Sequence, residues 1–556
     1  MKRTFFSIFI LIGIASPAFS QSWIWAQSAT GPSSYSEGRS VATDPTGNVY
    51  VAGYFDSPTL SFGTNTLTNA RGDDAFLAKY SSSGSLLWVK SAGGSDDDEG
   101  LSVTTDASGN VYFVGHYESA HITFGSFVLP NPGLVTRIFI VKYDGAGNVL
   151  WATSPVGSGS YNYCSVATNT SGDFYVSGGF NSPNITFGTY SLFNSGSDNI
   201  FIAKYDGNGN AIWAKSVGGS GSDNSLCIAS DSFGDAIVTG NFNSPTVTFG
   251  TDTLTNPGGH NFFIAKFDGT GNVLWAKNAG GVGSAAGFSV TADALGNSYV
   301  TGSFNSTTIT FGPYTLTNTG VGTSDLFFAK YDGAGNVIWV KNAGGAGQDY
   351  GSSVSLDASG NAYLTGGFNS PSFTFGTNTL PFPTGGVDPM FIAKCDSTGL
   401  VLCITLLPSG GEDNSAIATD AFGNAYVVSD FQTSSLILGN TTLTLRGTGN
   451  VFVARFNACA ISDTCHEIFI PNFFSPNNDG MNEYECIYGQ NCIKTFHFTI
   501  FDRWGEKVFE TSNSNECWDG TYHGQPMSSA GFVYFFSATL VDGEQIQKKG
   551  NITLMR

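Results

Sequence analysis

The sequence is short of positive charge and of long apolar runs. It has 23 lysine and arginine residues against 43 aspartate and glutamate residues, which gives a formal net charge of −20 at pH 7. So acidic a chain is repelled by phosphate backbones and anionic lipid headgroups. After Ile14, no segment approaches the roughly 18 uninterrupted apolar residues that a transmembrane helix needs. The sequence therefore predicts no nucleic-acid partner and no transmembrane segment.

Recognisable catalytic motifs are also missing. None of the six histidines lies in a metal-ligand spacing such as His-Glu-x-x-His. His116 and His121 are five residues apart, and we interpret them as surface histidines of a loop rather than a ligand pair. The chain has no Gly-x-Ser-x-Gly elbow, no P-loop and no dinucleotide-binding fingerprint. These absences disfavour an enzyme, although residues from several repeats could still assemble a catalytic site.

The N-terminus has the pattern of a secretory signal peptide. Lys2 and Arg3 precede an apolar run from Phe5 to Ile14, and Ala18 to Ser20 supplies the small residues that a signal peptidase reads. The run is too short to cross a bilayer. We therefore predict a signal peptide over residues 1–20 and a mature protein that starts at Gln21.

A pattern of four short strands recurs seven times, at a spacing of 62 to 64 residues. Alternating apolar residues, as in Phe201 to Tyr205, are typical of half-buried strands. Turns such as Asp106 to Asn110 join them, since Asp bonds the backbone two residues on and Gly accepts positive φ. Four antiparallel strands per repeat predict an all-β fold, a seven-bladed β-propeller over residues 21–456. The landmark positions, interpreted as repeat core, are Trp25, Trp88, Trp151, Trp213, Trp275, Trp339 and Cys403.

The strand order also predicts how the ring closes. The first copy begins with its tryptophan strand, Trp23 to Gln27, and the last copy ends with Phe452 to Phe456. We expect these two strands to pair, which would leave no exposed sheet edge between the first and last blades. A β-solenoid is the competing fold, but its repeats are usually shorter and it needs capping units that this sequence lacks.

A second domain follows the repeats. Residues 457–467 form a short linker, and residues 468–556 contain strand patterns such as Phe498 to Glu510 and Gly531 to Leu540, separated by Trp-Gly and Asp-Gly turns. Such strands over about 90 residues predict a small antiparallel β-sandwich of the immunoglobulin-like kind.

These motifs resemble two known families. Asn48 to Phe55 and Phe76 to Tyr80 are similar to the SBBP, or seven-bladed β-propeller, repeats of bacteria. Ile470 to Tyr484, Cys517 to Met527 and Gly550 to Arg556 resemble, in order, the gliding motility-associated C-terminal domain, the type B sorting domain of type IX secretion in Bacteroidota. The second resemblance implies export through the periplasm to the cell surface or medium. It also implies the type IX machinery and a PorP/SprF-type outer-membrane protein as partners.

Two polar positions recur in every copy, and we interpret both as scaffold. Each third strand has a cation whose stem can lie along apolar surface while its charge meets a carboxylate. Each first strand ends in an acidic or amide turn residue. The cations are Lys79, Lys142, Lys204, Lys266, Lys330, Lys394 and Arg455. The turn residues are Asp44, Asp106, Asn169, Asp231, Asp293, Asp357 and Asp420.

The loops from each tryptophan strand to the next copy vary freely, unlike the other turns. In a propeller these loops share one end face with the segments that contain Phe-Gly, and variable loops on a rigid scaffold are typical binding sites. The candidate ligand-binding residues in them are Asp96, Asp97, Asp98, Glu99, Tyr161, Tyr163, Asp223, Asp349, Tyr350, Glu412 and Asp413.

No cofactor is firmly implied by the sequence. Asn477, Asp479 and Glu483 lie in an oxygen-rich segment, for which calcium is one interpretation and a plain polar turn is the other. The repeat turns lack a full set of alternating oxygen ligands, so hairpin chemistry explains them.

Nine cysteines in an exported chain permit disulfides. Cys395 and Cys403 replace aromatic residues of the repeat, and we interpret them as buried thiols. The remaining cluster predicts two bridges with one thiol left over, among Cys459, Cys465, Cys486, Cys492 and Cys517.

Together these patterns predict a secreted or surface-displayed, monomeric propeller that acts as a binding or adhesion module, with a glycan or a surface protein as its ligand. One alternative is an extracellular hydrolase or lyase acting on polysaccharide. The other is a structural component of the cell surface or of gliding motility. Fold alone does not decide among them.

Overall fold

The computed structural model describes residues 19–32, 35–69, 71–157, 163–320, 322–383, 389–407, 415–461, 470–477, 484, 487, 493–513, 516–540 and 545–556. The chain divides into two compact units, Ser20–Ala460 and a second that contains Ile461–Arg556. The described regular structure is strand throughout, so no helix in it could cross a membrane. The predicted signal peptide lies outside the described residues except for its last two, which begin the first strand.

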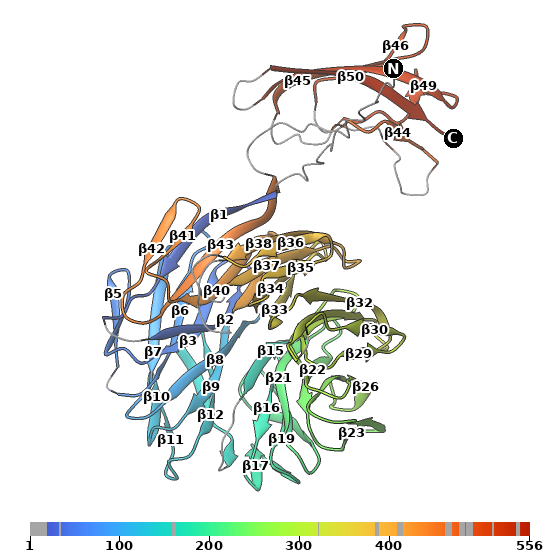
Figure 1. Ribbon diagram of the computed structural model, residues 1–556. Helices are drawn as coiled ribbons and strands as arrows, with labels where there is room; N and C mark the ends of the chain where they lie inside the picture. Colours follow the sequence, from blue (N-terminus) through green and yellow to red (C-terminus); the bar gives the residue numbers. More distant parts are fainter. Residues whose placement is uncertain are drawn as a thin grey trace, which may run out of the picture. The chain divides into compact units, whose positions relative to one another are not determined.

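The repeated strands of the first unit form seven antiparallel groups of four among its described residues (Figure 1). The inner strands are β2 (Ser36–Thr43), β8 (Asp98–Thr105), β15 (Cys164–Thr168), β21 (Asp223–Ser230), β27 (Ala285–Ala292), β33 (Asp349–Leu356) and β39 (Ala416–Thr419). The second strands are β3 (Val49–Phe55), β9 (Val111–Tyr117), β16 (Phe174–Phe180), β22 (Ala236–Phe242), β28 (Ser298–Phe304), β34 (Ala362–Phe368) and β40 (Ala425–Phe431).

The third and outer strands complete each group. The third strands are β6 (Asp74–Tyr80), β12 (Arg137–Tyr143), β19 (Asn199–Tyr205), β25 (Asn261–Phe267), β31 (Asp325–Tyr331), β37 (Met390–Cys395) and β43 (Asn450–Ile461). The outer strands are β7 (Leu86–Ala92), β13 (Val149–Thr153), β20 (Ala211–Val217), β26 (Val273–Ala279), β32 (Val337–Gly344), β38 (Val401–Leu407) and β1 (Phe19–Ser28).

A short hairpin containing Phe-Gly lies between the second and third strands of each repeat. The hairpins are β4 (Thr59–Phe62) with β5 (Asn65–Thr68), β10 (His121–Phe124) with β11 (Phe127–Pro130), β17 (Asn184–Phe187) with β18 (Tyr190–Phe193), β23 (Thr246–Phe249) with β24 (Asp252–Thr255), β29 (Thr308–Phe311) with β30 (Tyr314–Thr317), β35 (Ser372–Phe375) with β36 (Asn378–Pro381), and β41 (Ser435–Leu438) with β42 (Thr441–Thr444). A two-residue strand, β14 (Val156–Gly157), pairs with β17.

The ring closes as the sequence predicts. β1 is hydrogen-bonded beside β43, so the two ends of the repeat region share one sheet, as Figure 1 shows. The inner strands contact one another in a closed cycle in which β39 touches β2. An apolar core fills each space between neighbouring sheets. The all-β propeller fold and the predicted closing pair are therefore confirmed.

Each tryptophan strand also links its sheet to the next. The indole Nε1 of Trp213 donates to the carbonyl of Gly269 at 3.2 Å, and Nζ of Lys204 donates to the same carbonyl at 3.1 Å. The indole ring lies against Gly271, whose φ of +86° only glycine adopts readily. At the closing junction, Trp25 and Arg455 donate in the same way to the carbonyl of Ser82. The repeated cations therefore act as scaffold.

Two local predictions need correction. Cys403 is buried as predicted, but it is disulfide-bonded and not a free thiol, so this replacement of tryptophan also provides a covalent link. β43 continues to Ile461, so the predicted linker over residues 457–467 begins as strand. Cys395 is a buried free thiol and Cys517 is disulfide-bonded, as predicted. The other predicted bridge cysteines lie outside the described side chains.

The second unit is a single five-stranded sheet in its described residues, with one further hairpin. The sheet order is β44 (Phe473–Phe474), β50 (Gln545–Leu554), β49 (Ala530–Leu540), β45 (Ile493–Phe501), β46 (Lys507–Thr511), and the hairpin joins β47 (Thr521–Tyr522) to β48 (Gln525–Pro526). One face packs around the buried indole of Trp518. β44 pairs parallel to β50, so the prediction of a wholly antiparallel domain is wrong at this pair.

Candidate functional site

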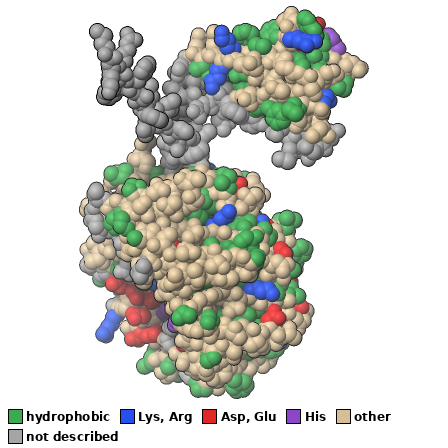
Figure 2. Space-filling view, turned by 45° about the vertical axis from the view of Figure 1, so that its right-hand side comes forward, with side chains coloured by type: hydrophobic (Ala, Val, Ile, Leu, Met, Phe, Trp, Pro, Cys, Tyr) green, Lys and Arg blue, Asp and Glu red, His purple; other side chains and the backbone are tan. Residues whose placement is uncertain are grey.

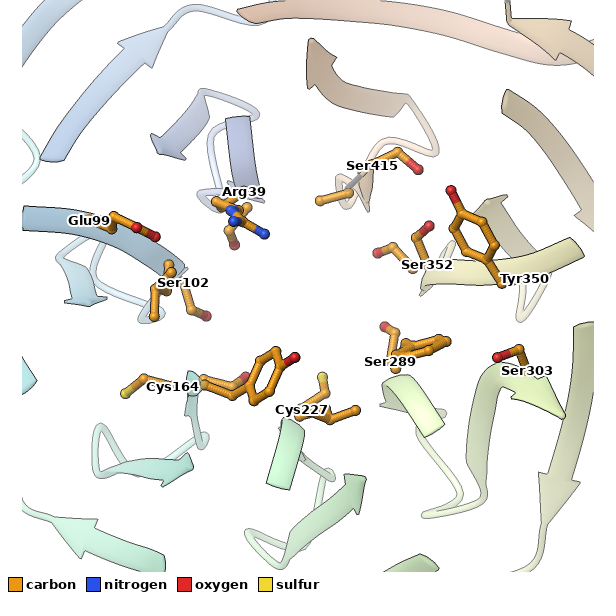
Figure 3. Close-up of a pocket in the computed structure, with 18 of the residues that line it drawn as sticks. Arg39, Glu99, Ser102, Cys164, Cys227, Ser289, Ser303, Tyr350, Ser352 and Ser415 are labelled. Atoms are coloured by element: carbon orange, nitrogen blue, oxygen red, sulfur yellow. The ribbon is translucent and has the colours of Figure 1, made fainter. Parts of the chain in front are cut away.

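The inner strands surround a cavity of about 760 Å³, which is the candidate functional site. Figure 3 shows that its labelled side chains come from several sheets and border one open space. This volume lies within the range of small-molecule sites, about 300–1,000 Å³. The propeller therefore offers a ligand a central, recessed position rather than only a flat end face.

A β-bulge repeated in the inner strands supplies the cavity wall. In five inner strands the pairing register shifts by one residue, for example between Gly38 and Ser40. A bulge leaves one residue out of the ladder and re-aims its side chain. The bulged residues all line the cavity, and they are Arg39, Leu101, Leu226, Phe288 and Ser352. This position therefore varies in chemistry from blade to blade while its backbone geometry repeats.

The residue after each bulge is nearly always serine, and it has a structural role. Oγ of Ser40 accepts a hydrogen bond from the backbone N of Val103 in the next blade at 3.2 Å, and Ser102 does the same for Val166 at 3.2 Å. Ser165, Ser289 and Ser353 continue the series. These five serines, here called the serine ring, thus join neighbouring inner strands at equivalent positions.

One side of the cavity carries charged groups. Nε of Arg39 lies 2.9 Å from Oε1 of Glu37, a residue that is only 2% exposed. Burial lowers the pKa of Arg39, but attraction to Glu37 and smaller contributions from Tyr54 and Glu99 outweigh burial and raise it overall. In the next blade, Oε1 of Glu99 lies 3.6 Å from Nε2 of His116. Both Arg39 and Glu99 are therefore held in place by a partner behind them.

In three blades, the described variable loop meets the Phe-Gly hairpin of the same blade at the predicted end face. The backbone N of Asp96 donates to Oγ of Ser119 at 3.1 Å, and Gly221 and Gly347 make the equivalent bond to Ser244 and Ser370 at 2.8 Å. The variable loops therefore lie beside the start of the Phe-Gly hairpins, as predicted.

The structure separates the predicted ligand-binding residues into four groups. Glu99, Tyr163 and Tyr350 line the cavity. Asp96 and Asp97 are exposed and lie outside its lining. Asp98, Asp223 and Asp349 lie at the ends of the loops, and all three are fully buried. Tyr161, Glu412 and Asp413 lie outside the described residues.

The three buried aspartates have an internal use. Asp98 accepts a hydrogen bond from Oγ of Ser119 at 2.7 Å, and the same bond joins Ser244 to Asp223 at 2.7 Å and Ser370 to Asp349 at 2.5 Å. A carboxylate that is buried and already bonded to its own hairpin has no face to offer a ligand. We therefore exclude these three residues from the candidate site.

The predicted calcium position remains a prediction. Asn477 is described, whereas Asp479 and Glu483 are not. Within the described part of the chain, no group of three or more acidic, histidine or cysteine side chains could hold a metal ion.

Sequence reasoning missed the bulged residues, including Arg39 and Phe288. A bulge shifts the period-two alternation by one residue, and within a strand of about eight residues such a shift is not distinguished from an irregular strand end. A usable signal was present, however. Among the inner strands, the position before the repeated serine, which is Cys227 in one copy, changes from Arg39 to Leu101, Leu226, Phe288 and Ser352 while its neighbours stay similar.

Acidic groups are crowded near the start of β6 and β8. Burial, followed by repulsion from Glu99 and Asp97, raises the pKa of Asp73 to about 7. Burial and repulsion from Asp98 raise the pKa of Asp74 to about 7, and burial raises that of Asp98 to about 6. Figure 2 shows acidic side chains gathered on one part of the propeller surface. This crowding makes the propeller sensitive to pH.

We expect the propeller to be more stable at pH 5 than at pH 7.5. Aspartate in an unfolded chain titrates near pH 4, so the folded unit holds extra protons between about pH 4 and 7. Its free energy of unfolding therefore falls as pH rises through this window, by about 1–3 kcal/mol. Urea unfolding at the two pH values measures the difference. Asp74→Asn should reduce it, while Asp519→Asn in the second unit should not; higher stability at pH 7.5 would contradict the expectation.

Family comparisons agree with both parts of the chain. Residues 468–554 match the family model described as the CHU_C type IX secretion signal domain. Residues 24–55 match the one described as the SBBP beta-propeller repeat. The two resemblances seen in the sequence are therefore confirmed. The secretion signal domain implies export to the cell surface or outside the cell.

More distant similarities cover larger parts of the chain but indicate no activity for it. The chain is 28% identical over 343 residues to an uncharacterized WD repeat-containing protein of Acanthamoeba polyphaga mimivirus, which covers 49% of this chain and 24% of that protein. A chain of the mitotic checkpoint complex is 12% identical with a TM-score of 0.39, over 82% of this chain and 98% of that one. The Pan2 WD40 domain of Neurospora crassa is 9% identical with a TM-score of 0.35, over 78% and 97%. The propeller assignment accordingly comes from the strand pairing.

Proposed function

We propose that this exported propeller is a binding module whose ligand enters the central cavity and contacts the bulged residues of the inner strands. The observation that carries the proposal is the repeated bulge. It places one unpaired side chain from each of five inner strands in a cavity of about 760 Å³, and those side chains differ in chemistry from strand to strand. Varied side chains on an invariant scaffold are typical of recognition sites.

The secretion signal domain fits this role because it would deliver the module to the cell surface or the medium. We propose the type IX machinery as its export partner, with an outer-membrane protein of the PorP/SprF type. The propeller would act as a monomer, since every inner strand already has a neighbour on both sides in the ring.

The hydrolase alternative receives no support from the cavity. Glycoside hydrolysis ordinarily needs a pair of carboxylates that flank the scissile bond. Among the described residues that line the cavity, Glu99 is the one carboxylate. We therefore propose binding without turnover.

A cavity-filling variant tests the proposal. Leu226 is a bulged residue, so Leu226→Trp should occupy the cavity without removing a ladder hydrogen bond. The matched control is Leu274→Trp, which lies on outer strand β26 and is 49% exposed. The mature proteins are applied to a glycan array and to polymers extracted from the surface of the host. Binding that Leu226→Trp abolishes and Leu274→Trp retains would support the proposal; no binding, or equal binding by both variants, would refute it.

A further inference from the structure

Arg39 presents a fixed hydrogen-bond donor to the cavity. Its guanidinium is held by Glu37, which also accepts a hydrogen bond from the hydroxyl of Tyr54 at 2.5 Å. Nη2 lies 3.5 Å from that tyrosine oxygen, whereas Nη1 has no hydrogen-bond partner among the described residues. Figure 3 shows Arg39 at the edge of the open space. Because Glu37 is buried behind it, Arg39 is oriented before any ligand arrives.

Glu99 supplies an acceptor on the neighbouring strand. It follows Glu37 at the equivalent place in the next blade, since Glu37 pairs with Tyr54 and Glu99 pairs with His116. Burial raises the pKa of Glu99, but its hydrogen bond and attraction to His116, with a smaller contribution from Arg39, lower it overall. The carboxylate is therefore ionised at neutral pH. A donor and an acceptor thus stand side by side on β2 and β8.

The serine ring adds further donors. Oγ of Ser40, Ser102 and Ser353 each accepts a backbone N–H from the next blade, which uses one lone pair and fixes the side chain. In the described part of the chain, no acceptor receives the hydroxyl proton of these three serines. All three line the cavity, so their hydroxyl groups can donate to a ligand or to water within it.

The rest of the wall is neutral and partly aromatic. Tyr163, Phe288 and Tyr350 lie among the lining residues, and Tyr163 is 49% exposed. Among the described lining residues, Arg39 is the one cation and Glu99 the one anion, so their charges cancel. An anionic ligand would meet Glu99, with Glu37 behind Arg39, inside a chain whose net charge is −20. A cationic ligand would meet the guanidinium.

We infer that the cavity takes a neutral saccharide, an inference that rests on the proposed binding function. Adjacent sugar hydroxyls can accept from Nη1 of Arg39 and donate to the carboxylate of Glu99. Further hydroxyls can accept from the serine ring, while the apolar C–H face of the sugar packs against the aromatic rings. Neutral ligands with many hydroxyls and an apolar face satisfy every group that the wall presents.

Isothermal titration of the full mature protein tests this inference. The probes are neutral oligosaccharides, namely cello-, xylo- and manno-oligosaccharides, and acidic ones, namely oligogalacturonates and alginate fragments. We expect binding to at least one neutral series and at least about tenfold weaker binding to the acidic ones. Arg39→Met and Glu99→Gln should each weaken neutral binding by about tenfold or more, since each removes a bond to a charged group. Arg71→Met, an exposed arginine outside the lining, is the matched control.

Arg39→Met leaves Glu37 buried without its partner, so the double variant Arg39→Met with Glu37→Gln provides a neutral counterpart that should fold. Thermal melts identify variants that are unfolded. A preference for acidic saccharides, or unchanged neutral binding in the folded variants, would overturn the inference. If Leu226→Trp abolishes binding of another ligand class on the array, the saccharide inference fails while the proposed function stands. If Leu226→Trp changes no binding at all, the proposed function itself fails.

Discussion

Removal of residues 468–556 is expected to leave a folded propeller in the periplasm and to abolish its delivery to the cell surface or medium. The family match places the secretion signal in residues 468–554. The propeller, Ser20–Ala460, is a separate compact unit with its own cores, so the truncation should not unfold it. Fractionation of a host with type IX secretion measures the distribution, and a melting curve of the truncated protein checks its fold.

The controls distinguish loss of the secretion signal from loss of the fold. Full-length protein with Trp504→Ala, a side chain that is 76% exposed, should be exported normally if that ring has no part in recognition. Residues 468–556 fused to a foreign periplasmic protein should carry it outward. If the truncated propeller reaches the surface or medium at the level of the intact protein, the second unit is not the export signal of this chain.

A mature chain that begins at residue 31 instead of residue 21 is expected to lose at least about 3 kcal/mol of stability, the lower end of the cost of emptying one large aromatic site. The deletion removes β1, whose residues link the two ends of the ring. Trp25 donates to the carbonyl of Ser82, and the ring of Trp23 lies 5.5 Å from that of Phe456. The backbone N of Ala29 donates to the carbonyl of Val451 at 3.1 Å.

Urea unfolding of the two chains measures this loss. The deletion should also expose β43 as a sheet edge, which favours aggregation of the shortened chain. Ile24→Ala is the matched control in the same strand, because Ile24 is 46% exposed and its removal should change stability by no more than about 0.5 kcal/mol. Equal unfolding midpoints for the chains that start at residues 21 and 31 would show that β1 does not close the ring.

Much of the fold could be predicted because it depends on short-range pattern. The alternation in Phe201 to Tyr205 encodes a strand locally, and the turn from Asp106 to Asn110 encodes its reversal. The pairing of β1 with β43 followed from counting complete strand patterns. The export domain followed from motif order up to Arg556. Each of these conclusions needs only residues that are close in sequence or that repeat at a regular spacing.

The candidate site could be predicted only in part. Of the residues that loop variability indicated, Glu99, Tyr163 and Tyr350 line the cavity. The same reasoning included Asp98, although this residue starts a strand and bonds to Ser119, 21 residues further along the chain. Composition and variability do not distinguish a carboxylate that faces a ligand from one that is bonded to its own hairpin.

The sequence by itself determined the repeat, the strand order and the closing strand pair, since local periodicity and turn chemistry encode them. Its C-terminal motifs indicated the export domain through their resemblance to a known family. Only the tertiary structure decided which side chains converge. Trp25 and Ser82, 57 residues apart, meet because the ring closes. Arg39 faces the cavity because a bulge removes it from the ladder and Glu37 holds it there. Such contacts depend on the curvature of the whole ring, and no short segment of sequence contains that information.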